Sequence, residues 1–314
     1  MRFVFFFLFV SVAWAQPYPE KPVRMIVSYP AGGPTDVVAR ILAERLGERL
    51  RQPIVVENRP GASGIIGNSA VAKAPPDGYT LLFTVDTTLT VTPITNPNTP
   101  FDPVADFAPV SLVMETVQAL VVNANVPAQN VAELFALAKQ QPMSYVSGGV
   151  ASPGHLAMLM LSQEAGLQTN HIAYKGIGQA LPAVVNGDVP MLITPTQLVW
   201  PLVRAGKLRL LAVMGTKRSP KAPDAPTLYE LGYRSAQNSI GNYILLAPAG
   251  TPAPVPELLH RELGAVLALP EVQSRLEPLE VTPVNDSPAQ TAARIKRDLA
   301  QWRELIGRLK LKVD

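Results

Sequence analysis

Short apolar segments alternate with helical patterns along most of the chain, and turns rich in Gly and Pro separate them. This order is typical of parallel strands joined by crossover helices, so it predicts an α/β fold. The predicted strands are Val23–Tyr29, Ile54–Glu57, Thr80–Val85, Ala119–Asn123, Ser144–Ser147, His171–Tyr174, Met191–Thr194, Leu208–Met214 and Tyr243–Ala247. The predicted helices are Asp36–Arg51, Gly64–Lys73, Val131–Gln140, Gly154–Ala165, Gly178–Asn186, Thr196–Ala205, Thr227–Leu231, Val255–Leu267, Pro270–Leu276 and Ser287–Leu309.

The first 15 residues have the pattern of a secretory signal peptide. Arg2 precedes an apolar run that ends at Val10, and Ala13-Trp-Ala15 supplies the small residues of a cleavage site before Gln16. The run is shorter than the roughly 20 residues that span a bilayer. We therefore expect cleavage after Ala15 and a mature protein located in the periplasm.

Composition narrows the class of protein further. The chain has no Cys, which excludes both a disulfide framework and a lipid-attached cysteine. Its 27 Lys and Arg residues are scattered among 24 Asp and Glu residues, so no basic face for nucleic acid is predicted. Cleavage leaves about 300 residues, at the size where single cores stop growing, and two domains are expected.

The segment Met25–Arg40 reads as a buried strand, a glycine turn and the start of a helix. Thr35 or Asp36 is the predicted N-cap. Gly32 and Gly33 lack a β-carbon, so backbone can approach a ligand there, and the free N–H groups of the next helical turn favour an anion. An ordinary strand-to-helix turn explains the same residues equally well.

Similar glycine turns follow other predicted strands and open other predicted helices. They are Asn58–Gly64, Ser147–His155 and Tyr174–Gly178. Ligands of open parallel sheets bind beyond the carboxyl ends of the strands. Two such sheets facing each other would form a cleft lined by backbone N–H groups and suited to a small anion.

The order and spacing of several motifs give a more specific identification. The chain resembles the Bug-type periplasmic solute-binding receptors of the tripartite tricarboxylate transporter family over essentially its whole mature length. The motifs are Tyr18-Pro-Glu-Lys-Pro-Val-Arg24, Pro30-Ala-Gly-Gly-Pro-Thr-Asp-Val-Val-Ala-Arg40, Val56-Glu-Asn-Arg-Pro-Gly-Ala62, Pro76-Asp-Gly-Tyr-Thr-Leu-Leu82, Asp106-Phe-Ala-Pro-Val-Ser-Leu112, Tyr174-Lys-Gly176, Ala205-Gly-Lys-Leu-Arg209, Lys217-Arg-Ser-Pro220 and Leu246-Ala-Pro-Ala-Gly-Thr-Pro252.

The resemblance implies two domains of the type II periplasmic-binding-protein kind, a Venus flytrap, each a mainly parallel sheet with flanking helices. The first domain is expected to comprise residues 16–120 and 245–314, and the second residues 121–244. The implied function is capture of a small carboxylate, with ordered water, and its delivery to integral membrane permease subunits. Amino acids, dicarboxylates and aromatic acids are all candidate ligands. A monomer without cofactor, metal or nucleic acid is expected.

The resemblance also carries ligand contacts over to this chain by motif. Three of these residues have an alternative role: Asp36 can cap its helix, His155 can be a hydrogen-bonded structural residue, and Lys175 can be a solvated turn residue. The implied contacts are Ala31, Gly32, Gly33, Thr35 and Asp36 in the first domain, and Ser147, Gly148, Ser152, His155, Tyr174, Lys175 and Gly176 in the second.

The chain departs from the family pattern at two places that bear on ligand choice. Asp86, followed by Thr87, stands after the third predicted strand where a hydroxyl is common, and both are candidate contacts. If Asp86 faces the cleft, it disfavours polyanions such as citrate and favours a ligand with nitrogen beside its carboxylate. Thr194 stands where a carboxylate is frequent, and it is the remaining candidate contact.

An enzyme is the main competing class, and the sequence offers little for it. No nucleophile elbow, phosphate loop or dinucleotide fingerprint is present. The three histidines show no metal spacing, and His171 and His260 are predicted in a strand and a helix unrelated to the pocket loops. An acid–base pair of Asp36 and Asp86 has no supporting nucleophile. A sensor that hands its liganded form to a signalling protein would use the same pocket.

Overall fold

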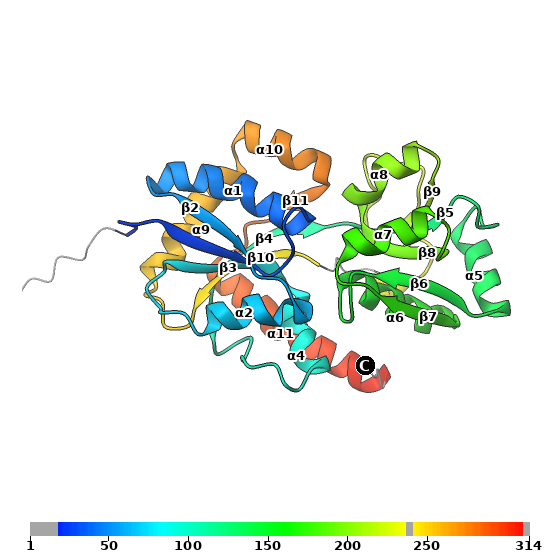
Figure 1. Ribbon diagram of the computed structural model, residues 1–314, viewed down its shortest axis with the longest axis horizontal. Helices are drawn as coiled ribbons and strands as arrows, with labels where there is room; N and C mark the ends of the chain where they lie inside the picture. The colour runs from blue at the N-terminus through cyan, green and yellow to red at the C-terminus, as the bar shows by residue number, and fades with distance from the viewer. Residues whose placement is uncertain (1–17, 237–240, 310–314) are drawn as a thin grey trace, which may run out of the picture.

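Two β-sheets, each covered by helices on both faces, organise the chain (Figure 1). The structure is a computed structural model that describes residues 18–236 and 241–309. We call the part built on the six-stranded sheet the first domain and the part built on the five-stranded sheet the second domain. The prediction of two α/β domains is confirmed, whereas the predicted signal peptide lies outside the described residues. The residue boundaries of the domains stay a prediction.

The first domain contains the sheet order β11-β4-β10-β3-β1-β2. Its strands are β1 (Val23–Val27), β2 (Ile54–Asn58), β3 (Thr80–Val85), β4 (Phe107–Thr116), β10 (Tyr243–Pro248) and β11 (Val281–Pro283). Its helices are α1 (Pro34–Leu50), α2 (Ile65–Ala72), α3 (Thr87–Thr90), α4 (Thr92–Thr95), α9 (Pro254–Leu267), α10 (Pro270–Leu276) and α11 (Pro288–Leu309), with short 3₁₀ segments η1 (Ala62–Gly64) and η3 (Glu277–Leu279).

The second domain contains the sheet order β7-β6-β8-β5-β9. Its strands are β5 (Gln118–Asn123), β6 (Met143–Ser147), β7 (Thr169–Ala173), β8 (Met191–Pro195) and β9 (Leu208–Val213). Its helices are α5 (Val131–Gln140), α6 (Pro153–Ala165), α7 (Ile177–Val185) and α8 (Thr196–Arg204), with the 3₁₀ segment η2 (Arg234–Ala236).

Both faces of each sheet are buried, which explains the continuous apolar runs in the central strands. In β1, Met25 joins one apolar cluster while Ile26 joins the cluster on the other face. In β5, Leu120 and Val121 divide between two clusters in the same way. Successive side chains of a strand point to opposite faces, so a strand with helices on both sides must be apolar throughout.

The sheets are mixed, where mainly parallel sheets were expected. Strand β1 is parallel to β2 and β3, but β10 is antiparallel to both β3 and β4. In the second domain β6 is parallel to β7 and β8, while β5 is antiparallel to β8 and β9. Strands β5 and β10 are antiparallel to their neighbours because of where the chain crosses between the domains. Each begins directly after such a crossing, next to the carboxyl ends of the strands with which it pairs.

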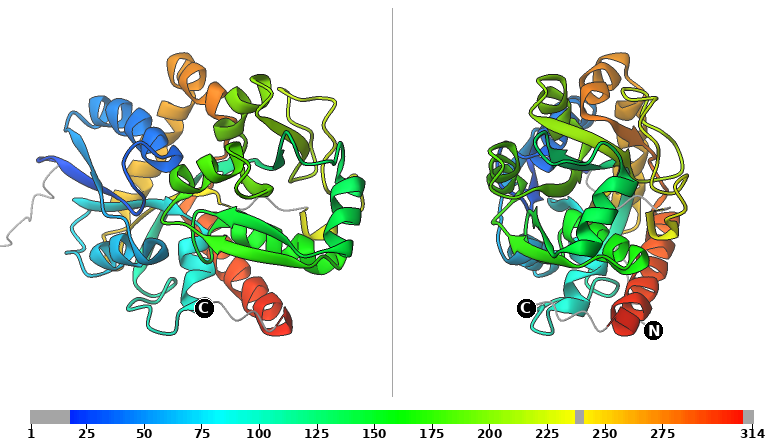
Figure 2. Two further views of the ribbon diagram at one scale, coloured as in Figure 1. Left: turned by 45° about the vertical axis from the view of Figure 1, so that its right-hand side comes forward. Right: turned by 90° about the vertical axis from the view of Figure 1, so that its right-hand side faces the viewer.

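Helix α11 contacts both domains. It packs on β4 and α3 of the first domain, where Ile295 is buried. Further along, Trp302 and Leu305 pack against an apolar cluster of the second domain, and Ile306 joins Leu156 of α6. Figure 2 shows α11, in red, extending from the first domain beside the second. The apolar stripe predicted for this helix therefore does pack in the core, and it is shared between the two domains.

The largest differences from the predicted elements have local causes. Strand β4 was not predicted, because Pro109 interrupts its pattern; a register irregularity in its pairing with β10 accommodates this residue. The predicted helix Thr227–Leu231 is a single turn that Gly232, with φ of 96°, brings to an end. Within the described part of the chain, no helix combines the length and apolarity needed to cross a bilayer.

Candidate functional site

The turn between β1 and α1 forms as predicted, but its helix begins earlier. Gly33 is the N-cap and Pro34 is the first helical residue, so Thr35 and Asp36 lie inside the first turn. The predicted N-cap at Thr35 or Asp36 is wrong, because proline is favoured at the first helical position and its fixed φ starts the helix there. Gly32 has φ of 77°, a conformation that suits glycine.

The Asp36 carboxylate holds this loop in place. It accepts hydrogen bonds from the backbone N of Gly32 (2.8 Å), from Arg40 Nε (3.0 Å) and from Asn58 Nδ2 (2.9 Å). Burial raises the pKa of Asp36, but these hydrogen bonds and the charge of Arg40 outweigh burial and leave the pKa lowered. Ala31 and Gly32 beside it are exposed. The carboxylate therefore has a structural role, whether or not it also contacts a ligand.

Replacing Asp36 with Asn is expected to lower the free energy of unfolding by about 1–3 kcal/mol, because an amide would direct a donor at one of the three donors. Urea unfolding followed by circular dichroism would measure the change. The control is Glu48→Gln, which removes an exposed ion pair with Arg45 on the same helix and should leave stability unchanged. Equal effects of the two substitutions would contradict the structural role of Asp36.

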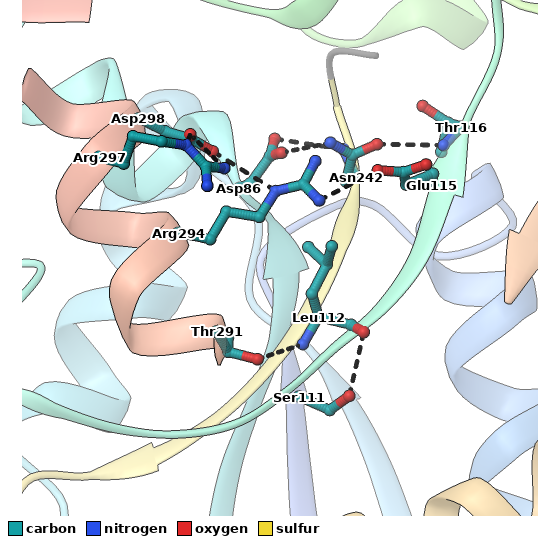
Figure 3. A network of polar contacts seen from close by, with 10 residues as sticks. All are labelled: Asp86, Ser111, Leu112, Glu115, Thr116, Asn242, Thr291, Arg294, Arg297 and Asp298. Atoms are coloured by element: carbon teal, nitrogen blue, oxygen red, sulfur yellow. Dashed lines mark hydrogen bonds and ion pairs between the residues drawn. The ribbon is translucent and has the colours of Figure 1, made fainter. Parts of the chain in front are cut away.

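Asp86 follows β3 and is tied to both segments that join the domains (Figure 3). Its Oδ1 accepts from the backbone N of Asn242 (3.2 Å) and its Oδ2 from Asn242 Nδ2 (2.8 Å). Asn242 Oδ1 in turn accepts from the backbone N of Thr116 (3.2 Å). Burial raises the pKa of Asp86 to about 7, against the effects of the Asn242 hydrogen bond and the charge of Arg294. Asp86 is thus a buried, titratable group beside the hinge, the name we give to the two segments near Thr116 and Asn242 where the chain crosses between the domains.

In the second domain, Ser147 lies beside two stacked histidines. Ser147 Oγ is 2.6 Å from Nε2 of His171, and the ring of His171 stacks on that of His155 with centroids 3.8 Å apart. His155 Nδ1 accepts from the backbone N of Ala151 (3.0 Å). Burial, with a contribution from His171, lowers the pKa of His155 to about 3, and burial also lowers the pKa of His171. Both rings are therefore neutral near pH 7.

The expectation that His171 is unrelated to the pocket loops is wrong. Strand β7 pairs with β6 so that His171 lies opposite Tyr145, two residues before Ser147. The pairing register of the two strands places the ring over His155. No local sequence signal carries that register, which is why the sequence did not identify this residue.

The two glycine turns of the second domain pack on each other. A β-carbon on Gly148 would lie 2.9 Å from the backbone N of Ile177, an approach that only glycine permits. Tyr174 packs on an apolar cluster of this domain, whereas Lys175 is exposed. The backbone of Gly176 has φ of 121°. These turns present backbone rather than long side chains to their surroundings.

Turns from the two domains meet at one interface. The ring of Pro30 lies 4.0 Å from the position of a β-carbon on Gly176. Ser63 Oγ donates to the backbone O of Val150 (2.9 Å), which joins η1 to the turn after β6. The carboxyl ends of β1 and β2 therefore face those of β6 and β7, as expected for a ligand site between two such sheets.

Three buried hydroxyl groups near this interface have no hydrogen-bond partner among the described residues. They are Oγ of Ser152 at the start of α6, Oγ1 of Thr194 at the end of β8 and Oγ1 of Thr196 at the start of α8. A buried hydroxyl without a partner costs about 1–3 kcal/mol. A polar ligand or a water molecule would supply the missing partners.

A cavity of about 1080 Å³ also lies between the domains. Of the residues predicted as ligand contacts, Asp86 and the buried Thr87 line it. The other predicted contacts lie outside its lining, at the interface of the turns. The remaining walls come from α3, the segment Glu115–Val117, the segment Met214–Lys217, α6, η2, β11 and α11.

Charged side chains of α11 line this cavity, and the sequence interpretation missed them. Arg294 pairs with Glu115 (3.0 Å) and with Asp298 (3.6 Å), which places an ion-pair network next to Asp86 (Figure 3). The helix was interpreted from its apolar stripe alone. Arg294 and Asp298 flank that stripe, whose Trp302 and Leu305 line the same cavity, and this clustering of charge beside the stripe is the signal that could have identified the wall.

Known proteins share this two-domain architecture. The family model described as tripartite tricarboxylate transporter family receptor matches residues 38–311. The structure of the periplasmic binding protein BugD is similar, with a TM-score of 0.85 and 34% identity over 93% of this chain and 99% of that one. R. palustris Rpa4515 with adipate has a TM-score of 0.87 and 29% identity over 93% and 98% of the two chains. MatC from Rhodopseudomonas palustris with bound malate has a TM-score of 0.82 and 27% identity over 92% and 100%.

Proposed function

Because the chain belongs to the tripartite tricarboxylate transporter family of receptors, we propose that it captures a small organic carboxylate between its two domains in the periplasm. The observation that carries this proposal is the interface where glycine turns at strand ends of both domains face each other. Two solved relatives with the same fold hold adipate and malate, which are dicarboxylates. A carboxylate suits a site of backbone N–H groups at helix starts.

The proposed contacts divide into two kinds. Backbone N–H groups of Ala31 and of the turns 147–148 and 175–176 would bind the carboxylate oxygens, since these turns present little side chain. The N–H groups of Gly32 and Gly33 donate within their own turn, so these two residues would allow close approach of the ligand to the backbone. The hydroxyls of Ser152 and Thr194, which lack partners among the described residues, would orient the rest of the ligand. Thr35, Asp36, His155 and Tyr174 would support these loops from behind, consistent with their burial or packing.

The charge of Asp86 bears on which acid the site accepts. In its ionised form, which its pKa of about 7 allows at and above neutral pH, the Asp86 carboxylate disfavours a second negative charge nearby and favours a ligand that carries an amine or ring nitrogen. Amino acids, dicarboxylates and aromatic acids are therefore the classes to compare. Asp86 also hydrogen-bonds to Asn242 at the hinge, so its effect on the ligand would be exerted from the wall of the site.

We further propose that the liganded form is recognised by membrane permease subunits of a tripartite transporter. A sensor that signals its liganded state would use the same interface and remains the second candidate. An enzyme has less support. Ser147 and His171 lie within hydrogen-bond distance, but the Ser147 hydroxyl belongs to a fully buried residue and also lies 2.9 Å from the backbone O of Gly149.

The experiment is a thermal-shift panel on refolded, ligand-free protein with amino acids, dicarboxylates, tricarboxylates and aromatic acids. A ligand at a hundred times its dissociation constant adds roughly 2.7 kcal/mol, which is a shift of several degrees for a chain of this size. A hit confined to nitrogen-bearing acids supports a site next to Asp86. A citrate-like hit places Asp86 away from the ligand, and no shift with any acid would falsify the proposed function.

The variant Thr194→Val tests whether an acid that stabilises the wild type binds at the proposed site. The substitution removes a buried hydroxyl without a partner among the described residues, so the ligand-free protein should be at least as stable as the wild type. The ligand-induced shift should fall. The control is Thr169→Val in the same sheet, which removes a hydrogen bond to Ser162 and should leave the ligand-induced shift unchanged. An undiminished shift for Thr194→Val would exclude this hydroxyl as a contact.

A further inference from the structure

A second contact between the domains lies outside the turns of the proposed site, next to the crossing segment after β4, because β11 begins at Val281 and Val281 pairs with Thr116. The carboxylate of Glu280, between η3 and β11 of the first domain, accepts hydrogen bonds from two side chains of the second domain. Ser219 Oγ donates to Oε1 (2.7 Å), and Trp200 Nε1 in α8 donates to Oε2. Ser219 and Trp200 are both buried. Hydrogen bonds to a charged acceptor in such surroundings are among the strong ones.

A lysine of the second domain extends this contact. Lys221 Nζ donates to the backbone oxygens of Glu277 (3.1 Å) and Pro278 (3.0 Å), the residues of η3. We call the set Trp200, Ser219, Lys221 and Glu277–Glu280 the Glu280 latch. All four hydrogen bonds run from donors in the second domain to acceptors in the first. All four hold together in the domain arrangement that the structure shows, in which the turns of the proposed site meet.

The backbone conformation of Glu280 supports a dependence on the other domain. Its φ is 49°, in the left-handed region that is unfavourable for a residue with a β-carbon. Among the described residues, six non-glycine residues have positive φ. Four of them lie in segments that contact the other domain: Ala62, Ser63, Ala151 and Glu280. Strained conformations of this kind persist where surrounding contacts hold them.

We propose that the Glu280 latch stabilises the closed arrangement of the two domains, so that Glu280 sets ligand affinity from outside the binding site. The proposal rests on the proposed function, in which a ligand touches both domains. A protein that binds ligand in the closed state has an apparent affinity proportional to the closed fraction. Weakening the latch would lower that fraction and leave every ligand contact in place.

The first test measures domain closure without ligand. The chain has no Cys, so Lys73→Cys in the first domain and Lys139→Cys in the second, both exposed, accept one spin label each. Pulsed electron–electron double resonance then gives the distribution of distances between the two labels. In Glu280→Gln, which keeps the shape but directs a donor at one of the two donors, the closed fraction should fall at least threefold. Ser219→Ala should shift it in the same direction by less.

The control is Glu230→Gln, which breaks an exposed ion pair with Arg218 inside the second domain, one residue before Ser219 in sequence. Its distances should match those of the wild type. Thermal unfolding of each variant separates opening from loss of fold. A closed fraction that is the same in Glu280→Gln and in the wild type would overturn the proposal, and so would an equal change in Glu230→Gln.

The second test measures affinity for an acid that shifts the wild type in the thermal panel. Glu280→Gln should raise the dissociation constant by the same factor as the closed fraction falls, at least threefold, with the order of preference among acids unchanged. Unchanged affinity together with changed distances would mean that the latch does not act on the ligand, and would overturn the affinity claim. If no acid binds the wild type, the proposed function fails, while the distances still decide whether the latch closes the domains.

Discussion

Gly154→Ala is expected to lower the free energy of unfolding by about 3 kcal/mol, because helix α6 lies too close to strand β8 for any β-carbon at this position. A β-carbon on Gly154 would lie 2.1 Å from the carbonyl O of Ile193 and 3.2 Å from its carbonyl C. Both are backbone atoms of a central strand, which cannot rotate away as a side chain can. The helix must therefore shift, and its packing against the sheet must loosen.

Urea unfolding followed by far-ultraviolet circular dichroism measures this effect. Gly307→Ala is the matched control, because a β-carbon on this exposed glycine of α11 meets nothing within 4 Å. Alanine has the higher helix propensity, so the control should be as stable as the wild type or up to roughly 1 kcal/mol more stable. A Gly154→Ala protein as stable as this control would show that α6 does not approach β8 as closely as described.

Asp86→Asn is expected to remove a fall in stability that the wild type shows between pH 5 and pH 8. Burial raises the folded-state pKa of Asp86 from its ordinary value of 3.8 to about 7. The folded protein therefore keeps a proton that the unfolded chain has lost. In this window the free energy of unfolding decreases as pH rises, and the contribution of Asp86 is about 1–3 kcal/mol. Asparagine cannot ionise, so that contribution disappears.

The sign depends on every charge near Asp86. Asp298 acts with burial to raise the pKa, whereas Arg294 and the hydrogen bonds from Asn242 and from the backbone of Thr87 act to lower it. The measurement is a series of urea titrations at pH 5, 6, 7 and 8. The stability difference between Asp86→Asn and the wild type should move in favour of the variant as pH rises. Asp188→Asn, on an exposed loop, should keep the wild-type profile; a parallel profile for Asp86→Asn would refute the prediction.

What the sequence could predict was local. The turn after β1 and the turn after β6 were found because glycine at fixed offsets from an apolar run has a direct backbone meaning. Strand β4 was missed because Pro109 broke the local pattern, and its neighbour β10 arrives from more than a hundred residues further along the chain. Non-local pairing of this kind leaves no periodic signal.

At the candidate site too, the sequence did not predict contacts between residues that lie far apart along the chain. His171 reaches Ser147 through strand register, and Glu280 reaches Ser219 through the packing of one domain on the other. Neither relation follows from residue spacing. Asp86 was singled out by its departure from the family pattern, but its partner Asn242 was not, since a hydrogen bond across 156 residues cannot be inferred from one sequence.

The place of β10 in the first sheet has a consequence for how the chain acquires its structure during synthesis. Strand β10 lies between β4 and β3, so β4 cannot join the group formed by β1, β2 and β3 until residues 243–248 have been made. The five strands of the second sheet are complete at Val213. We expect the inserted domain to become resistant to protease first on a nascent chain, although its polypeptide begins more than a hundred residues after the start. The N-terminal third would remain the vulnerable part until nearly the whole chain has emerged.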